Sequence, residues 1–286
     1  MKSFDVKNLK ELYLSPKDSH KGQNGKLMII GGSKLFHGAS LWALKIASRV
    51  VDMVFYSSVP ENNEIAKKLK SELYDLILVP RDKIGSYIEE SECVLIGPGM
   101  PREEGREKNE EPTKEIVKRL LNKYPEKKWV IDGGALTEMK TDWIPQKAIL
   151  TPHVKEFGKL FKYQISNIKY QNDISKIKNL REDLKKKAKK HNCAILLKGQ
   201  IDIVCSPEKC QIVEGGNAGM TKGGTGDVLA GLAAAFYCKN NAFLAASAAS
   251  YINKKAGEEL FKKAGYYFNA SDLCNQIPLT MKIILR

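Results

Sequence analysis

Short apolar runs rich in β-branched residues alternate with amphipathic helical segments along most of this chain, and this alternation restricts the fold more than any other feature. The amphipathic segments include residues 40–51, 113–122 and 174–190. Strands that alternate with helices form a mostly parallel sheet covered on both faces. The sequence therefore predicts a layered α/β fold, with strands at residues 26–30, 53–56, 76–79, 93–96, 129–131, 148–150 and 194–197.

The last third of the chain changes character. Residues 201–205 and 210–213 flank Ser206-Pro207-Glu208-Lys209, a pattern that predicts a hairpin and thus an antiparallel edge. Beyond it, residues 228–237 and 242–256 carry Ala, Leu and Gly on nearly every face, which is typical of helices packed tightly against a sheet. We find no linker, and we interpret the charged residues 101–112 as a mobile loop.

The strongest chemical signal is the segment GGNAGMTKGGTGD, residues 215–227, which an apolar helical stretch follows at once. Glycines are costly unless the backbone must turn sharply or approach a ligand closely. Free amides and the positive end of the dipole at a helix start favour a phosphate group. The segment therefore predicts an anion-binding loop. Asp227 at its end could take a proton from an attacking hydroxyl, and the alternative is that it only complements the helix dipole.

Three further strands end in turns that could form a ligand cleft. Gly31-Gly32-Ser33, Gly97-Pro98-Gly99 and Thr151-Pro152-His153 each follow a predicted strand. The carboxyl ends of parallel strands meet at one edge, where ligands bind in open α/β folds. We expect Thr151 to cap a helix whose first residue is Pro152. The Walker and dinucleotide fingerprints GxxxxGK[ST] and GxGxxG are absent from the sequence.

Taken in order, these motifs resemble one known family, the ADP/ATP-dependent NAD(P)H-hydrate dehydratases of the ribokinase-like kinases. The resemblance spans roughly residues 20–260 and rests on HKGxxGKxxIIGGS, LIGPG, DxxAL, TPHxxEF, LLKG and GGTGDVLAG. It implies a ribokinase-like three-layer sandwich formed by residues 1–286 as a single domain, without an amino-terminal epimerase domain. A separate epimerase would then be a plausible partner.

The resemblance also implies a reaction and a set of residues. ATP or ADP, with Mg²⁺, would phosphorylate the hydroxyl of hydrated NADH or NADPH, and loss of phosphate would restore the cofactor. Asp227 would be the base, and the amides of Gly224, Thr225 and Gly226 would stabilise the transferring phosphoryl group. The other family positions fall into a substrate set and a nucleotide set. They are Ala39, Gly99, His153 and Asp227 for the substrate, and Lys198, Gly199, Gln200, Ile201, Asp202 and Gly226 for the nucleotide.

The chain departs from the family pattern at four places. Pro101 follows Gly99-Met100 where an apolar residue and Gly are usual, and it removes a backbone donor. Val154-Lys155 replaces Pro-Gly, and Asp132-Gly133-Gly134 replaces Asp-Ala-Asp. Asp202 replaces a Thr and adds a charge beside the expected nucleotide, so the resemblance does not separate ADP from ATP.

Half of the net charge of +14 lies in one stretch. Residues 162–190 hold ten Lys or Arg against three acids, net +7, and Ile174, Ile177, Leu180 and Leu184 recur there at helical spacing. We favour a solvated amphipathic helix, because strand-tracking nucleic-acid binders interleave aromatic residues with basic ones. Nucleic acid is therefore not an expected partner.

The cysteines and histidines show no pattern of a metal or redox site. Six Cys and four His form neither CxxC nor HExxH, so we predict buried thiols and no protein-built metal site. The longest late uncharged run, residues 240–253, is shorter than a membrane span, and no signal peptide is evident in residues 1–16. We expect a cytoplasmic protein and a homo-oligomer.

Two other functions stay open at this point. One is a ribokinase-like kinase that phosphorylates a small hydroxylated metabolite or vitamin precursor and stops at the phosphoester. The other is a nucleotide-binding regulator or nucleic-acid binder that uses residues 162–190, and its affinity would fall steeply with salt.

Overall fold

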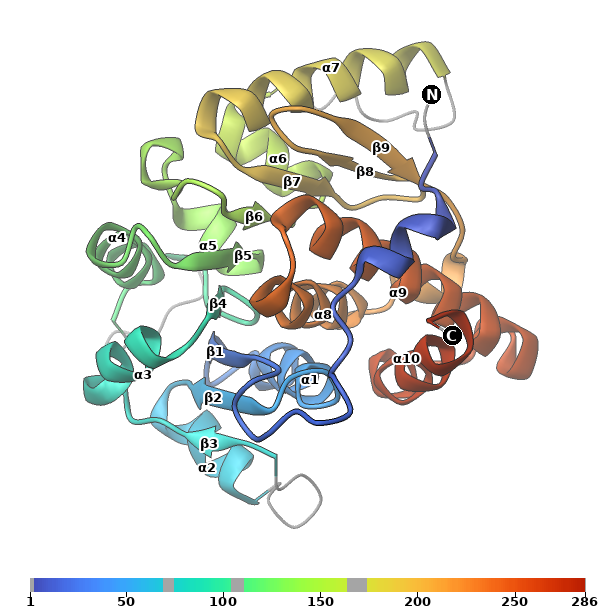
Figure 1. Ribbon diagram of the computed structural model, residues 1–286. Coiled ribbons are helices and arrows are strands. Elements are labelled where there is room, and N and C mark those ends of the chain that lie inside the picture. Colours follow the sequence, from blue (N-terminus) through green and yellow to red (C-terminus); the bar gives the residue numbers. More distant parts are fainter. Residues whose placement is uncertain (1–2, 69–74, 104–110, 164–173, 286) are drawn as a thin grey trace.

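A nine-stranded sheet in the order β3-β2-β1-β4-β5-β6-β7-β8-β9 runs through the computed structural model (Figure 1). The structure describes residues 3–68, 75–103, 111–163 and 174–285. Strands β1 to β7 are parallel to one another, β8 runs antiparallel to β7, and β9 runs antiparallel to β8. The strands are β1 Lys26–Ile30, β2 Met53–Ser57, β3 Ile77–Leu78, β4 Cys93–Ile96, β5 Lys128–Ile131, β6 Ile149–Leu150, β7 Ala194–Leu197, β8 Asp202–Cys205 and β9 Cys210–Val213.

Helices cover both faces of this sheet, which makes three layers (Figure 1). They are α1 His37–Ala47, α2 Pro60–Lys68, α3 Ile84–Glu90, α4 Thr113–Lys123, α5 Gly133–Glu138, α6 Val154–Phe161, α7 Ile174–His191, α8 Thr225–Lys239, α9 Ala242–Ala264 and α10 Ala270–Ile284. Short 3₁₀ turns lie at Val6–Glu11, Arg81–Lys83, Thr141–Trp143 and Ala218–Thr221.

The two faces have separate apolar cores because side chains alternate along each strand. In β1, Leu27 and Ile29 pack with α1, α8, α9 and α10, whereas Met28 and Ile30 pack with α3 to α7. Helix α8 is apolar on nearly all sides and is buried along most of its length. The predicted layered α/β fold is therefore confirmed.

Strand β1 lies between β2 and β4, so the chain reverses its direction of winding there. Such a switch point leaves a crevice at the carboxyl ends of the two strands, and ligands of open α/β sheets bind in that crevice. Gly31 follows β1 and Gly97 follows β4 at this edge. The topology thus fixes where the candidate site must be sought.

The predicted elements agree with the structure except at short ends. The β8–β9 hairpin forms as expected, and its turn is closed by the amide of Ser206, which donates to the carbonyl of Lys209 at 2.8 Å. In α7, Ile177, Leu180 and Leu184 are buried, as the amphipathic pattern predicts. Parts of the expected loop at 101–112 and of the basic stretch at 162–190 lie outside the described residues.

The prediction that all cysteines are buried thiols is wrong for two of them. Cys205 and Cys210 form a disulfide, whereas Cys93, Cys193, Cys238 and Cys274 are free and buried. The pair lies directly across the β8–β9 ladder, with the two Cα atoms 4.1 Å apart. Their sequence spacing matches no redox motif, so the motif search did not reveal the pair. The register of the hairpin is what brings the two residues together.

No described helix combines the length and apolar character that a membrane-spanning segment would need.

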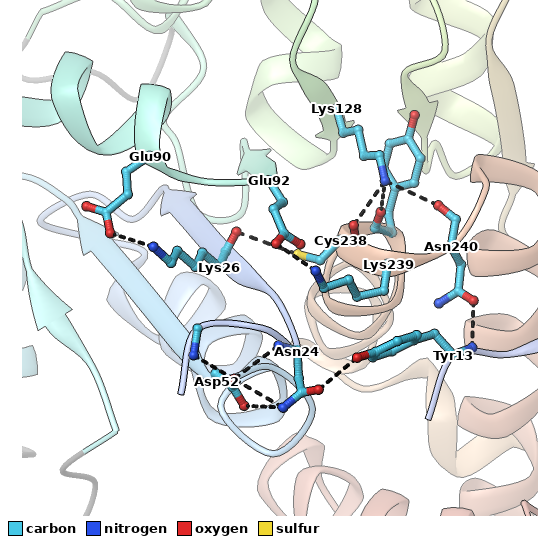
Figure 2. A network of polar contacts seen from close by, with 12 residues as sticks. Tyr13, Asn24, Lys26, Asp52, Glu90, Glu92, Lys128, Cys238, Lys239 and Asn240 are labelled. Atoms are coloured by element: carbon cyan, nitrogen blue, oxygen red, sulfur yellow. Dashed lines mark hydrogen bonds and ion pairs between the residues drawn. The ribbon is translucent and has the colours of Figure 1, made fainter. Parts of the chain in front are cut away.

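Lysine 128 bonds to the carboxyl end of α8 (Figure 2). Its Nζ atom donates to the carbonyls of Tyr237 and Cys238, both at 3.0 Å, and lies 3.5 Å from that of Asn240. These carbonyls end a helix, and a cation there also complements the negative end of the helix dipole. Lys128 belongs to β5, so this contact ties the helix to the centre of the sheet.

We predict that Lys128→Met lowers the free energy of unfolding by roughly 1–2 kcal/mol, because the carbonyls at the end of α8 lose a charged donor. Lys123→Met is the control, since Lys123 is exposed and lies over the ring of Tyr124. Urea unfolding of both variants measures the effect. Equal stability of the two variants would contradict this role of Lys128.

Candidate active site

The turns after β1 and β4 contact one another through their backbones. The amide of Gly32 donates to the carbonyl of Pro98 at 2.7 Å. A Cβ atom at Gly99 would lie only 3.1 Å from the Cβ of Ala39 and 2.3 Å from the carbonyl oxygen of Phe36. Ala39 and Gly99, expected from the family resemblance to bind substrate, therefore lie side by side at the switch point.

The glycine-rich loop enters α8 through a residue that must be glycine. Gly224 has φ +95°, and a side chain there would collide with the ring of Trp42. Within the described residues, the amides of Gly224 and Gly226 donate to no backbone carbonyl. The Thr225 amide makes a long bond of 3.4 Å to Lys222. The helix thus begins with open donors, and Asp227 is its third residue.

A buried ion pair lies next to this helix start. Nζ of Lys198, which follows β7, donates at 2.7 Å to Oδ1 of Asp132, which follows β5. The hydroxyl of Thr151 donates to the same oxygen at 2.7 Å. A Cβ atom at Gly226 would lie 3.5 Å from Nζ of Lys198. The ammonium group is therefore close to the open amides of α8.

Three carboxylates surround that single ammonium group, and their environment moves several pKa values. Burial and the charge of Asp132 raise the pKa of Asp227 to about 7, against the opposing effect of Lys198. Burial also raises the pKa of Glu156 to about 7. Burial opposes the charge of Lys198, but Asp132 and Glu156 outweigh it and raise the pKa of Lys198. An acid that titrates near neutrality suits a general base.

Histidine 153 begins helix α6 as its cap. Its Nδ1 atom accepts from the amides of Lys155 and Glu156 at 3.1 and 3.2 Å, and Glu156 accepts from the His153 amide at 2.8 Å. Both contacts require an unprotonated Nδ1, so the neutral ring carries its proton on Nε2. Burial and Lys198 lower the pKa of His153, which agrees with a neutral ring.

The expectation that Thr151 caps this helix is wrong. The hydroxyl of Thr151 instead bonds to Asp132 and to the carbonyl of Ile131, and α6 begins at Val154 rather than at Pro152. Serine and threonine are the common caps, so an imidazole in this role is difficult to anticipate.

A pocket of about 680 Å³ opens beside these groups. Lys198, His153 and Gly226 lie in its wall, as do Gly199, Gln200, Asp202 and Thr225. The remaining wall residues are Gly215, Gly216, Asn217, Ala218, Met220, Thr221, Leu229, Asn253 and Lys254. The residues expected to bind nucleotide therefore gather in one cavity, apart from Ile201, which is half-buried beside it.

Asp202 was expected to place a charge beside the nucleotide, but its carboxylate is bonded to other groups of the protein. Its carboxylate accepts from the Gly199 amide at 2.8 Å and from the hydroxyl of Ser250 at 2.7 Å. It also pairs with Lys254 at 3.5 Å. Nζ of Lys254 donates in addition to the carbonyls of Gly199 and Gln200. Asp202 thus shapes the turn after β7, and its oxygens are already occupied.

Lys254 and Asn253 were missed by the sequence reasoning, because both lie inside an Ala-rich helix with no local motif. Glu156 and Asp132 appeared in the motifs but were given no role. Their one signal was position, since each lies within a few residues of a strand end.

Comparison with known proteins agrees with this geometry. Residues 27–279 match the NAD(P)H-hydrate dehydratase family. The chain belongs to that family. An ADP-dependent (S)-NAD(P)H-hydrate dehydratase of Cenarchaeum symbiosum is 31% identical, over 93% of this chain and 91% of its own length. A bifunctional NAD(P)H-hydrate repair enzyme Nnr of Methanocaldococcus jannaschii is 34% identical over 96% of this chain.

The chain spans about half the length of the bifunctional family members, 52% in the Methanocaldococcus protein. Among solved structures, an ADP/ATP-dependent NAD(P)H-hydrate dehydratase of Bacillus subtilis, co-crystallised with ATP/Mg²⁺, superposes with a TM-score of 0.79. It covers 99% of this chain and 98% of its own at 22% identity. A ribokinase-like protein of Enterococcus faecalis gives a TM-score of 0.80 at 21% identity. The predicted ribokinase-like fold is confirmed.

The raised pKa of Asp227 gives a prediction for stability. Between about pH 4 and pH 7 the folded protein keeps a proton on Asp227 that the unfolded chain has lost. The wild type therefore loses stability progressively as pH rises over this range, and the loss is complete above pH 7. Asp227→Asn cannot ionise. Between pH 5 and pH 8, the free energy of unfolding of this variant should therefore rise relative to that of the wild type by roughly 2–3 kcal/mol, since each of the two pH units between 5 and 7 contributes about 1.4 kcal/mol.

Urea unfolding at both pH values measures that difference. Asp272→Asn is the matched control, because Asp272 is likewise the third residue of its helix, α10. If the stability of Asp227→Asn minus that of wild type stays constant or falls from pH 5 to pH 8, the carboxylate is not held in an environment that disfavours its charge.

Proposed function

We propose that this chain catalyses the nucleotide-dependent dehydration of hydrated NADH or NADPH. The observation that carries the proposal is the position of Asp227. It is the third residue of α8, directly after the open amides of Gly224 and Gly226, and it lies close enough to Lys198 for their charges to interact. A carboxylate that titrates near 7 can take the proton of a ring hydroxyl, while amides and an ammonium group favour a transferring phosphoryl group. Family membership supports the same reaction.

In the proposed reaction Asp227 accepts the hydroxyl proton as that oxygen bonds to the terminal phosphorus of ATP or ADP. The bond from this phosphorus to the nucleotide's bridging oxygen breaks, and the shortened nucleotide leaves. The phosphoester then loses inorganic phosphate and a proton from the neighbouring ring carbon, which restores the double bond. Ala39, Gly99 and His153 would hold the substrate. The hydrogen-bond donor of His153 would be Nε2, which lies 3.4 Å from Oε1 of Glu156.

Lys198, Gly199, Gln200, Ile201 and Gly226 are proposed to surround the nucleotide, with Gly224, Thr225 and Gly226 at the phosphoryl group. Asp202 is proposed to act here through the shape of the Gly199 turn, since its carboxylate bonds to that turn.

The carboxylates also suit Mg²⁺ that arrives with the nucleotide. Among the described residues no group of three or more His, Cys, Asp or Glu is arranged to hold a metal by itself. Mg²⁺ commonly binds through one or two carboxylates together with substrate phosphates, and Glu156 and Asp132 could supply these. When bound, the ion would neutralise phosphate charge during transfer.

Several sequence predictions stay predictions. They are a single domain over residues 1–286, a cytoplasmic location, self-association, and a separate epimerase that would supply the reactive epimer of the substrate.

We predict that Asp227→Asn lowers kcat by on the order of 10²- to 10⁴-fold with hydrated NADH and ATP or ADP, because the base is lost. Nucleotide affinity measured by calorimetry should change little. Asp272→Asn is the control for a helix-dipole effect and should keep full turnover. Turnover is followed by the absorbance of the restored nicotinamide and by released phosphate. A stable phosphoester without phosphate release would instead identify a kinase, and full activity of Asp227→Asn would refute the assigned base.

A further inference from the structure

The ring of Trp42, in helix α1, contacts the residue that opens helix α8. A Cβ atom on Gly224 would lie 2.4 Å from Cε3 and 2.5 Å from Cζ3 of the indole. Carbon atoms in contact are normally ~3.5–4.0 Å apart, so the ring already occupies the space beside the Gly224 backbone. The indole therefore limits how closely the end of the glycine-rich loop can approach α1.

The orientation of this ring is set by a hydrogen bond to α10. Nε1 of Trp42 donates to Oγ of Ser271 at 3.0 Å. Ser271 lies in the first turn of α10, where its amide donates to the side chain of Asn269 at 2.8 Å. The ring also lies against Gly38, where a Cβ atom would be 3.2 Å from it. A rotation of the indole would therefore break its bond to α10.

The connection from α9 to α10 also holds the glycine-rich loop itself. Nζ of Lys222 donates to the carbonyl of Phe268 at 2.7 Å and to that of Tyr266. A Cβ atom at Gly219 would lie 2.5 Å from Cε1 of Phe268. The loop and the start of α10 are thus joined at several points, and the indole contacts both.

Trp42 connects the two halves of the candidate site. Ala39 precedes it by three residues in α1 and lies beside Gly99, at the expected substrate position. The open amides of Gly224 and Gly226 belong to the loop end that the ring contacts. The one donor of the indole is already bonded to α10. Trp42 can therefore affect the site through the backbone that it supports rather than through a bond to a ligand.

We propose that Trp42 is a positioning residue. It sets the place of the Gly224 and Gly226 amides relative to the substrate hydroxyl, and Ser271 orients its ring. This inference rests on the proposed function, since it concerns the phosphoryl group of the same reaction. Open amides stabilise the charge that develops during transfer only where they match the transition state, and a displacement of about 1 Å can cost ~10²-fold in rate. The loss should therefore appear in kcat rather than in nucleotide affinity.

Three single variants and one double variant test this role with hydrated NADH and ATP or ADP. Trp42→Leu removes the ring and should lower kcat on the order of 10²-fold. Trp42→Phe keeps an aromatic ring and Ser271→Ala keeps the whole indole, so each should lose roughly tenfold. Both break the same hydrogen bond, so the double variant should lose no more than the larger single loss. Ser271→Ala tests the role in a variant that leaves the ring in place.

Calorimetry separates misplaced amides from partial unfolding. The dissociation constant of the nucleotide should change less than about threefold in every variant. The stoichiometry counts the molecules that can bind nucleotide, so an unchanged value together with a lower kcat excludes partial unfolding as the cause. Trp143→Phe is the matched control and should keep full turnover. Trp143 is also half-buried, but it ends the 3₁₀ turn Thr141–Trp143 and is not among the residues of the pocket wall.

The outcomes separate this inference from the proposed function. A wild-type kcat in Trp42→Leu, or losses that add in the double variant, overturns the positioning role while the wild type still dehydrates its substrate. A loss of nucleotide affinity or stoichiometry that accounts for the whole fall in turnover overturns it as well. A wild type that binds nucleotide but restores no nicotinamide overturns the proposed function, and this inference with it. Non-additive losses in kcat at unchanged affinity and stoichiometry support the inference.

Discussion

The charge of Lys198 is the condition on which the carboxyl edge of the sheet depends. Asp132, Glu156 and Asp227 would repel one another there, and this ammonium group, bonded to Asp132, lies among them and offsets the repulsion, with a smaller effect of Arg102 on Glu156. Breaking a buried pair leaves an uncompensated charge, which costs several kcal/mol. Burial is the larger cause, and together with the charge of Asp132 it raises the pKa values of Asp227 and Glu156 to about 7. Three carboxylates beside one ammonium group would also favour a further positive charge, such as a cation that accompanies a nucleotide.

Helix α8 can hold Asp227 and the open amides in a defined position because contacts at its two ends and in its middle fix the helix in place. Its amino end holds Asp227 and the open amides, and its other end bonds to Lys128 of the central strand β5. Between them, Gly231 lets the helix approach α1 so closely that a Cβ there would lie 2.6 Å from the carbonyl oxygen of Ala43. A helix that cannot slide or tilt keeps its first turn in register with the strand ends, which phosphoryl transfer requires.

Most of the fold and part of the site could be predicted from the sequence. The predicted features depend on residues close together in the chain, whereas the missed ones depend on strand register, on contacts between distant residues or on side-chain geometry. Strand runs and the loop before Asp227 are local patterns, and the structure has them at nearly the expected residues. The Cys205–Cys210 disulfide depends on hairpin register, and the Asp202–Lys254 pair joins residues far apart in the sequence. His153 as a helix cap was missed because side-chain geometry, rather than residue preference, decides it.

The polar groups of the pocket fall into two classes that serve different ends. Asp202 and Lys254 satisfy one another and nearby backbone groups, so their energy is realised in the free protein and fixes the shape of the cavity. Within the described residues, the amide of Gly226 donates to no backbone carbonyl. A ligand that brings a hydrogen-bond acceptor would supply its missing partner. The first class therefore determines whether the pocket exists, and the second determines what it binds.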